Sequence, residues 1–558
     1  MAKGESLLTK DLDEKSALNG GELPAGWFWP VLGLAAFLSL PYYFSLETFF
    51  SHDDFAILYF HKDWPIEKPW LFFRTDVLTF YRPFQSYVMA LLFYYFGMNA
   101  FPYGLVLVAI HVANVVLSGR LVERLFDNRA LTFFSVIFFA ADWEYCDVVF
   151  WKGNYGTALC WLFILGATNL FVDYLRGGGR GRYFGSLALA VAALLSKESA
   201  VNVPLLLSLL YWVRRPQRTE SDTGIHNVGP SAAEQPAATR THWLFAFARA
   251  LWPFYALAVA YGIFHLLAVR DVYDWLPKGY ELQGPIAATA AIFHAMAFWL
   301  APFLEASSPL FGAQGARPGL LDVLDRISGL LPLVLIAATV WSRNRRLIFG
   351  TLWAILAFVP ANLIPDYHTP RYYYGSIMGI AVVFAEVALA ADRAVAARRR
   401  FAEIATARVV GSLLILAFVY SNMIYTTALV SEDARKCRQI EDVYRFLALH
   451  RKYIPPKTLF RVQCLNSQDH FHEGMGLREM FKFALNDDSV EAILPDEALT
   501  DRVRNILLSE YTQPVEVYRD ASGVFRFGIA VPTTATAETE LPGPAQEQPG
   551  RALPKGEK

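Results

Sequence analysis

The chain has 558 residues, of which 54% are hydrophobic, 15% aromatic and 18% charged. Soluble domains carry about a quarter of charged residues, so this composition, with a mean hydropathy of +0.29, excludes an array of ordinary soluble domains. Long apolar runs recur from Trp27 to Tyr425 and predict one large polytopic α-helical membrane unit. The formal net charge of −1 is no sign of nucleic-acid binding, and we expect no nucleic-acid partner.

Residues 1–24 are polar and of mixed charge, and we expect them to be cytoplasmic. They are too long and too acidic for the start of a signal peptide, so the first apolar run is predicted to stay in the membrane. Arg and Lys in short loops mark the cytoplasmic side. Residues 25–427 then contain about eleven spans that start inside and end outside. The predicted spans are residues 27–46, 102–122, 131–141, 155–175, 183–195, 201–213, 245–269, 330–341, 347–364, 372–391 and 409–425.

Three other segments of this unit are predicted not to cross the membrane. Residues 81–97 are typical of an aromatic amphipathic helix at the interface, opened by Arg82-Pro83. Residues 285–311 are apolar, but as a span they would turn the later arginine clusters outside, so we predict a re-entrant or interfacial segment. Residues 214–241 are polar without periodicity and indicate a flexible cytoplasmic loop.

The tail has a different pattern. Residues 428–531 alternate short apolar runs with helical patterns and predict a small α/β domain on the extracytoplasmic side. Cys437 and Cys464 lie in this domain, and a disulfide and two free thiols are equally compatible with the sequence. Residues 532–558 are rich in Thr, Ala, Glu, Pro and Gly and should be disordered. The predicted strands are residues 459–464, 490–494, 515–518 and 525–531, and the predicted helices are residues 440–450, 477–484 and 499–508.

Asp53 and Asp54 follow the first span, in an outer loop of residues 47–80. Two adjacent carboxylates at a membrane exit are costly unless water or a cation reaches them, which suggests a catalytic role. A carboxylate can act as general base on a hydroxyl, and Arg or Lys can bind a phosphate. The pattern favours glycosyl transfer from a lipid-phosphate donor. The other notable residues on this face are Arg82, Asp142, Glu144, Asp147, Trp151, Lys152, Lys197, Glu198, Asp366, Tyr367, His368, Arg371 and Tyr372.

Five elements come in an order that resembles a known family. They are Asp53-Asp54, the Tyr-Arg-Pro-Phe of residues 81–84, the His-Val-Ala-Asn of residues 111–114, the Leu-Ser-Lys-Glu-Ser-Ala-Val of residues 195–201, and the Arg-Tyr-Tyr-Tyr of residues 371–374. Together they resemble the GT-C membrane glycosyltransferases over residues 27–391. The chain looks closest to the protein O-mannosyltransferase-like branch and to transmembrane mannosyltransferases with tetratricopeptide tails. It is more distantly similar to the aminoarabinose transferase of lipid A.

The resemblance implies a polyprenyl- or dolichyl-phosphate sugar as donor and inversion at the anomeric carbon. It implies Asp53 as general base, Asp54 as its orienting neighbour, and Arg82, Lys197 and Arg371 with Tyr372 at the donor phosphate. The tail lacks the 34-residue tetratricopeptide period, so a glycan, lipid or protein acceptor stays open. Residues that we expect to contact substrate are Asp142, Glu144, Trp151, Lys152, Glu198 and His368.

Simpler roles exist for several of these residues. Asp53 could only cap a helix of residues 54–61, Arg82 could snorkel to the interface, and Lys197 and Glu198 could form a mutual ion pair. For Tyr373 and Tyr374 we favour an aromatic belt at the membrane surface. His111 and Asn114, one helical turn apart, favour an interhelical hydrogen-bonding pair over ligands.

The sequence therefore predicts a multi-pass glycosyltransferase, transferring a hexosyl or pentosyl group, in the bacterial inner membrane with its site outside. Two other classes stay open: a transporter or flippase for lipid-linked sugars, which would need mid-span charges and matched broken spans, and a non-catalytic assembly subunit. A ligase or polymerase with a diphosphate donor is a further alternative. The sugar is open, and we assign no cofactor and no metal site. The Asp pair could bind a divalent cation, so metal dependence is open too.

Overall fold

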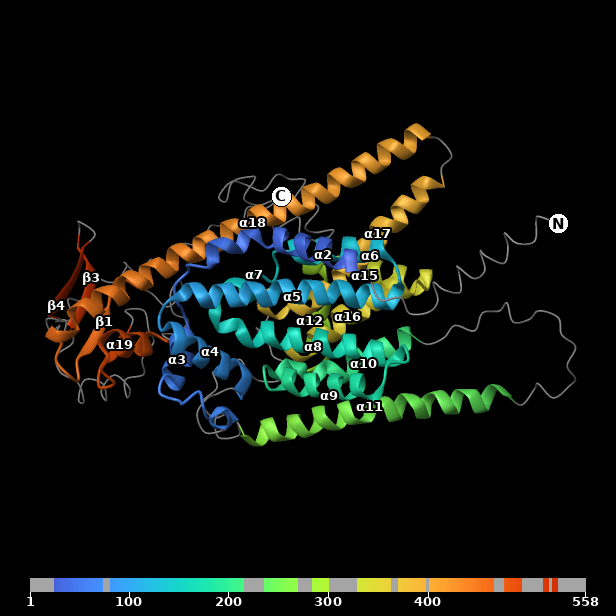
Figure 1. Cartoon of the computed structure of the whole chain (residues 1–558). Helices are drawn as coiled ribbons and strands as arrows, with labels where there is room; N and C mark the ends of the chain where they lie inside the picture. The colour runs from blue at the N-terminus through green and yellow to red at the C-terminus, as the bar shows by residue number, and fades with distance from the viewer. Residues whose placement is uncertain are drawn as a thin grey trace, which may run out of the picture.

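The computed structural model shows a helical bundle with a small β-sheet at one end (Figure 1). Several predicted features lie outside the described residues: the segment 1–24, most of the loop 214–241, part of the segment 285–311, His368, the helix 499–508 and the tail 532–558. The described residues are 25–73, 81–214, 235–268, 284–300, 329–362, 370–397, 401–465, 476–493, 515–520 and 524–529.

Most predicted spans are helices with nearly the predicted ends, because apolar runs of this length bury their backbone polar groups only as helices. Five helical segments are long and apolar enough to cross a membrane, namely residues 100–126, 152–175, 245–265, 374–396 and 404–453. Five shorter apolar helices accompany them in the described part of the chain. Large apolar side chains such as Trp252, Trp341 and Leu413 are exposed on these helices, as expected of an integral membrane protein. The helices are α5 (Ala100–Phe126), α6 (Arg129–Ala141), α8 (Tyr155–Leu175), α9 (Arg180–Leu194), α10 (Val203–Val213), α11 (Gln235–Ala268), α12 (Pro285–Trp299), α15 (Leu331–Ser342), α16 (Arg345–Asn362) and α17 (Tyr374–Ala396).

The first predicted span is divided into two elements. Helix α2 (Ala25–Leu38) ends before the 3₁₀ turn η1 (Leu40–Ser45), which carries Pro41 in its first turn. Proline has no N–H to donate and disfavours helical geometry in the residue before it, so the α-helix stops there. Helix α11 also differs from prediction, because it begins at Gln235 inside the expected loop.

The last span continues without a break into the tail. Helix α18 (Phe401–His450) has 50 residues and is therefore about 75 Å long at 1.5 Å per residue. The helix predicted at residues 440–450 is present, but it is the end of α18 and not a separate helix, because no Gly or Pro interrupts the chain between Ser412 and His450. Figure 1 shows α18 leaving the bundle and reaching the sheet.

The sheet has the strand order β2-β1-β3-β4. Strand β1 (Leu459–Val462) is parallel to β2 (Glu491–Ile493) and β3 (Val515–Arg519), and β4 (Phe525–Ile529) is antiparallel to β3. Helix α19 (Leu477–Leu485) connects β1 to β2 and packs on the sheet, with the rings of Phe460 and Phe481 4.9 Å apart. We call α19 and the four strands the sheet unit. All four predicted strands and the helix at residues 477–484 are present.

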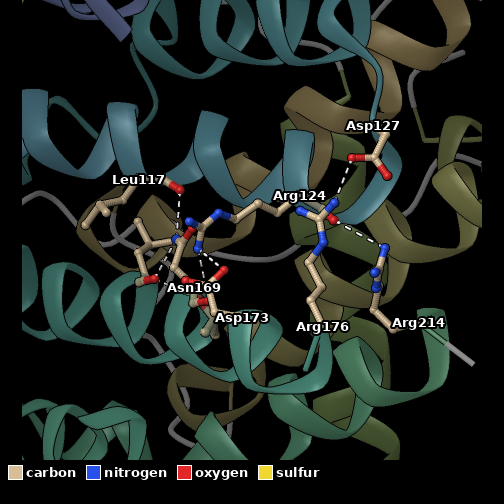
Figure 2. A network of polar contacts seen from close by, with 9 residues as sticks. Leu117, Arg124, Asp127, Asn169, Asp173, Arg176 and Arg214 are labelled. Atoms are coloured by element: carbon tan, nitrogen blue, oxygen red, sulfur yellow. Dashed lines mark hydrogen bonds and ion pairs between the residues drawn. The ribbon is translucent and has the colours of Figure 1, made fainter. Parts of the chain in front are cut away.

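We name the two ends of the bundle by the features beside them. Helix α5 runs about 40 Å from the end beside the sheet unit, the sheet end, to the opposite end, the arginine end. At the arginine end Arg124 of α5 forms an ion pair with Asp173 of α8, and Arg176 binds Asp127 at 3.1 Å (Figure 2). Arg214, after α10, donates to the carbonyl of Arg124 at 3.4 Å. These bonds tie the ends of three helices together.

Candidate active site at the sheet end of the bundle

The two carboxylates of the Asp pair have different surroundings. Asp53 is half-buried at the N-cap of α3 (Asp54–His61), but its side chain makes no capping hydrogen bond. Asp54 is 1% exposed, and its Oδ2 accepts a hydrogen bond of 3.0 Å from the backbone N–H of Ser51. We call residues 51–54 the acidic turn. Within it the chain exposes one carboxylate in part and buries the other.

Burial determines the protonation of Asp54. It raises the pKa of this carboxyl to about 8, and the charge of Asp53 adds to the rise, while the Ser51 amide and Lys152 oppose it. Asp54 therefore holds its proton at neutral pH. Its Oδ1 lies against Gly153, where an added Cβ would come within 2.9 Å of that oxygen. A side chain at position 153 would therefore force the buried carboxyl of Asp54 to shift.

Lys152 and helix α18 form the wall behind Asp54. Lys152 is 1% exposed and donates to the carbonyl of Thr48. Asp433 and Cys437 of α18 act electrostatically on Lys152, and the Cys437 thiol donates to Asp433 at 3.6 Å. All four cysteines are free, so Cys437 and Cys464 form no disulfide. Lys152, predicted to contact substrate, is thus placed behind the acidic turn.

Arg82 is held by Glu198 in a two-bond contact. Arg82 precedes α4 (Pro83–Phe96), and Glu198 opens the 3₁₀ turn η4 (Glu198–Asn202). Arg82 Nε and Nη2 donate to the two oxygens of Glu198 at 2.9 and 2.6 Å. The alternative of a Lys197–Glu198 ion pair is wrong, because the planar guanidinium fits a carboxylate with two bonds. The predicted interfacial helix at residues 81–97 is thereby anchored to the turn at Lys197.

Lys197 and Arg371 contact a hydroxyl and aromatic rings. Lys197 Nζ donates to Thr157 Oγ1 at 2.6 Å and lies 4.7 Å from the centre of the Tyr372 ring. The Arg371 guanidinium lies 5.4 Å from that ring centre and 5.0 Å from that of Trp151. Burial and then the charge of Arg82 lower the pKa of Lys197 to about 7. Arg82 and Arg371 both act electrostatically on Lys197, and we call these three residues the cation cluster.

Trp151 connects the acidic turn with the cation cluster. Its ring packs edge-on against the His52 ring, with the two ring centres 5.5 Å apart. The Arg371 guanidinium contacts the same tryptophan ring. Around the neighbouring Gly153, Asp54 Oδ1 and Trp151 Nε1 are buried without a hydrogen-bond partner among the described residues. Buried polar atoms of this kind are normally satisfied by a water or a ligand. The arrangement is that of a polar site built around Trp151.

The acidic residues that follow α6, within residues 142–147, lie in two different surroundings. Asp142 and Glu144 are 2% and 0% exposed, and Asp142 Oδ1 accepts from the Glu144 amide at 2.8 Å. Burial raises the pKa of Asp142 to about 7. Asp147 is not among the residues predicted to contact substrate; burial raises the pKa of its carboxyl, and the charge of Arg371 opposes this rise. The sequence signal was only its distance of one helical turn from Trp151.

His111, Asn114 and Tyr374 form a buried interhelical contact. Asn114 Nδ2 donates to the Tyr374 hydroxyl at 3.1 Å, and His111 Nδ1 lies 3.0 Å from the same oxygen. The predicted interhelical pair is confirmed. The aromatic belt predicted for Tyr373 and Tyr374 is wrong, because both are at most 3% exposed and Tyr373 packs on Trp299 inside the bundle.

Comparisons with known proteins give structural neighbours only. No family model and no curated protein matches the sequence. The fold is similar to ArnT from Cupriavidus metallidurans bound to undecaprenyl phosphate, with 14% identity, 88% of this chain and 90% of that chain covered, and a TM-score of 0.43. It is also similar to the Archaeoglobus fulgidus oligosaccharyltransferase tethered with an acceptor peptide, with 13% identity, 91% and 74% covered, and a TM-score of 0.45.

Proposed function

We propose that this protein is an integral membrane glycosyltransferase that moves a sugar from a polyprenyl-phosphate donor to an acceptor hydroxyl. The observation that supports it best is the contact of Trp151 with both His52 and Arg371. A general base and a group of phosphate-binding cations must meet at one reacting centre. His52, the neighbour of Asp53, and Arg371 of the cation cluster both contact the Trp151 ring.

Asp53 is the general base in this proposal. It is partly exposed, whereas Asp54 is buried with a pKa of about 8 and holds its proton at neutral pH. Asp53 takes the proton of the acceptor hydroxyl as the hydroxyl oxygen attacks the anomeric carbon. The bond between that carbon and the phosphate oxygen breaks, and the polyprenyl phosphate leaves with the electron pair. Attack opposite the leaving group inverts the anomeric configuration.

The cation cluster binds the donor phosphate. Within the described part of the chain, Lys197 and Arg371 have no carboxylate ion-pair partner and contact a hydroxyl and aromatic rings instead, so their charges can meet a phosphate. Arg82 is hydrogen-bonded to Glu198, and its positive charge acts on Lys197 from a distance. A phosphate would stabilise the protonated form of Lys197 and gain a charge-assisted hydrogen bond.

The site faces the extracytoplasmic side of the inner membrane in this proposal. Arg124, Arg176, Arg214 and Arg345 all lie at the opposite end of the bundle, and short arginine-rich loops stay in the cytoplasm. A lipid donor would enter between the bundle helices with its head at the sheet end.

The experiment offers the purified protein a panel of polyprenyl-phosphate sugars and polyprenyl-diphosphate sugars, with mixed acceptors. Release of polyprenyl phosphate coupled to a new glycoside, from monophosphate donors alone, is the expected result. Turnover of diphosphate donors alone would support a ligase. Movement of intact lipid-linked sugar between liposome leaflets, with no transfer, would support a flippase. Either outcome would overturn the proposal.

A further inference from the structure

The start of α19 touches the backbone of the acidic turn. Gly476 is the N-cap of α19 and has a φ of +84°. A Cβ added at Gly476 would lie 1.8 Å from the carbonyl oxygen of His52. Any side chain there would be strained in its backbone and would collide with fixed main-chain atoms. Two separate reasons, the backbone conformation and the collision, therefore require a glycine at this position.

That carbonyl belongs to the peptide bond that leads into Asp53. His52 itself has a φ of +48°, a left-handed conformation that non-glycine residues seldom adopt and that surrounding contacts must hold. Two contacts act on this residue from different elements. Trp151 packs against its ring at 5.5 Å, and Gly476 lies against its carbonyl.

Contacts along the outer loop extend this interface. Lys62, which follows α3, forms an ion pair of 3.1 Å with Asp488, which lies between α19 and β2. Phe483 of α19 packs on Tyr59 at 5.7 Å between ring centres. On the other side of the turn, Tyr444 of α18 packs on Phe49 and Phe55. The sheet unit and α18 thus hold residues 49–62 along their whole length.

We propose that the sheet unit is a clamp that positions the general base, with Gly476 as the positioning residue. The inference rests on the proposed role of Asp53. Gly476 fixes the His52–Asp53 peptide, and the peptide fixes the direction of the Asp53 carboxylate. A displacement of about 1 Å at a reacting group can cost about 100-fold in rate. The sheet unit therefore takes part in the reaction through the backbone of the acidic turn.

The test compares Gly476→Ala with Gly177→Ala in the full-length protein. Gly177 has a φ of +93° and nothing within 4 Å of an added Cβ, so its variant carries backbone strain without a collision. Gly476→Ala should speed hydrogen–deuterium exchange of residues 49–61 and lower kcat by about 10- to 100-fold. The KM for the donor should change little, because the phosphate binds to Lys197 and Arg371. Gly177→Ala should change none of these quantities.

Unchanged exchange in residues 49–61 would overturn the clamp, and faster exchange with unchanged kcat would overturn the positioning role. If the wild-type protein transfers no sugar, the proposed function fails, and the exchange measurement still decides whether Gly476 holds the turn. If Gly476→Ala does not fold, Asp488→Lys is used, since Asp488 has a side chain 67% exposed. Asp488→Lys should speed the exchange of residues 49–61, and adding Lys62→Glu should return the exchange rate to that of the wild type. Equal exchange in the wild type, the single variant and the double variant would contradict the clamp.

Discussion

The two ends of the bundle use charge differently. At the arginine end carboxylates bind guanidinium groups: Asp173 with Arg124 and Asp127 with Arg176 (Figure 2). The buried Glu386 likewise binds Arg346 and Arg393. The sheet end has one such pair, Arg82 with Glu198. Beside it, Asp54 is bound by a backbone amide, and Lys197 by a hydroxyl and a ring. Matched pairs hold helix ends in place, whereas cations that contact hydroxyls and rings keep the capacity to bind a phosphate.

The largest expected effect separates Asp53 from Asp54. Asp53→Asn removes the base and should lower kcat by about 10² to 10⁴-fold. Asp54→Asn should lose far less, because asparagine has the shape of the protonated carboxyl that burial favours at Asp54. Transfer rates of the two folded variants check this. Equal losses in both would contradict the division of roles.

A smaller effect compares cations at the two ends. Lys197→Ala and Arg371→Ala should each raise the donor KM by about 10- to 100-fold, the equivalent of one hydrogen bond to a charged group. Arg176→Ala removes a cation of the arginine end, where Arg176 is bound to Asp127, and should leave the KM unchanged. Donor titrations of the three variants measure the difference. An Arg176→Ala effect as large as the others would remove the distinction between the ends.

The smallest effect is a pH dependence. The pKa of Lys197 is about 7 without substrate, so Lys197 loses its charge as the pH rises above that value. Donor affinity should therefore fall between pH 7 and 9, by at most tenfold per pH unit. Lys197→Arg keeps its proton throughout this range and should remove the slope. A slope that persists in Lys197→Arg would assign the pH dependence to another group.

Much of the fold could be predicted from the sequence, since apolar runs of fixed length and the positions of Pro and Gly depend on local chemistry. Residues 155–175 are helical with the predicted ends. The continuity of α18 could have been predicted from the missing Gly and Pro.

The partners within the site could not be predicted from the sequence. Asp53 and Asp54 are neighbours with the same chemistry, and only the fold places Asp54 in a buried position and leaves Asp53 partly exposed. Glu198 is adjacent to Lys197 but binds Arg82, which lies 116 positions away. Such pairs depend on helix packing, which local patterns do not encode.

The most direct test of the account is a structure with a polyprenyl-phosphate sugar bound. The phosphate should lie within hydrogen-bond distance of Lys197 and Arg371, with the anomeric carbon on the side of Asp53. A phosphate at the arginine end, or one bound at the cation cluster with its sugar directed away from Asp53, would contradict it.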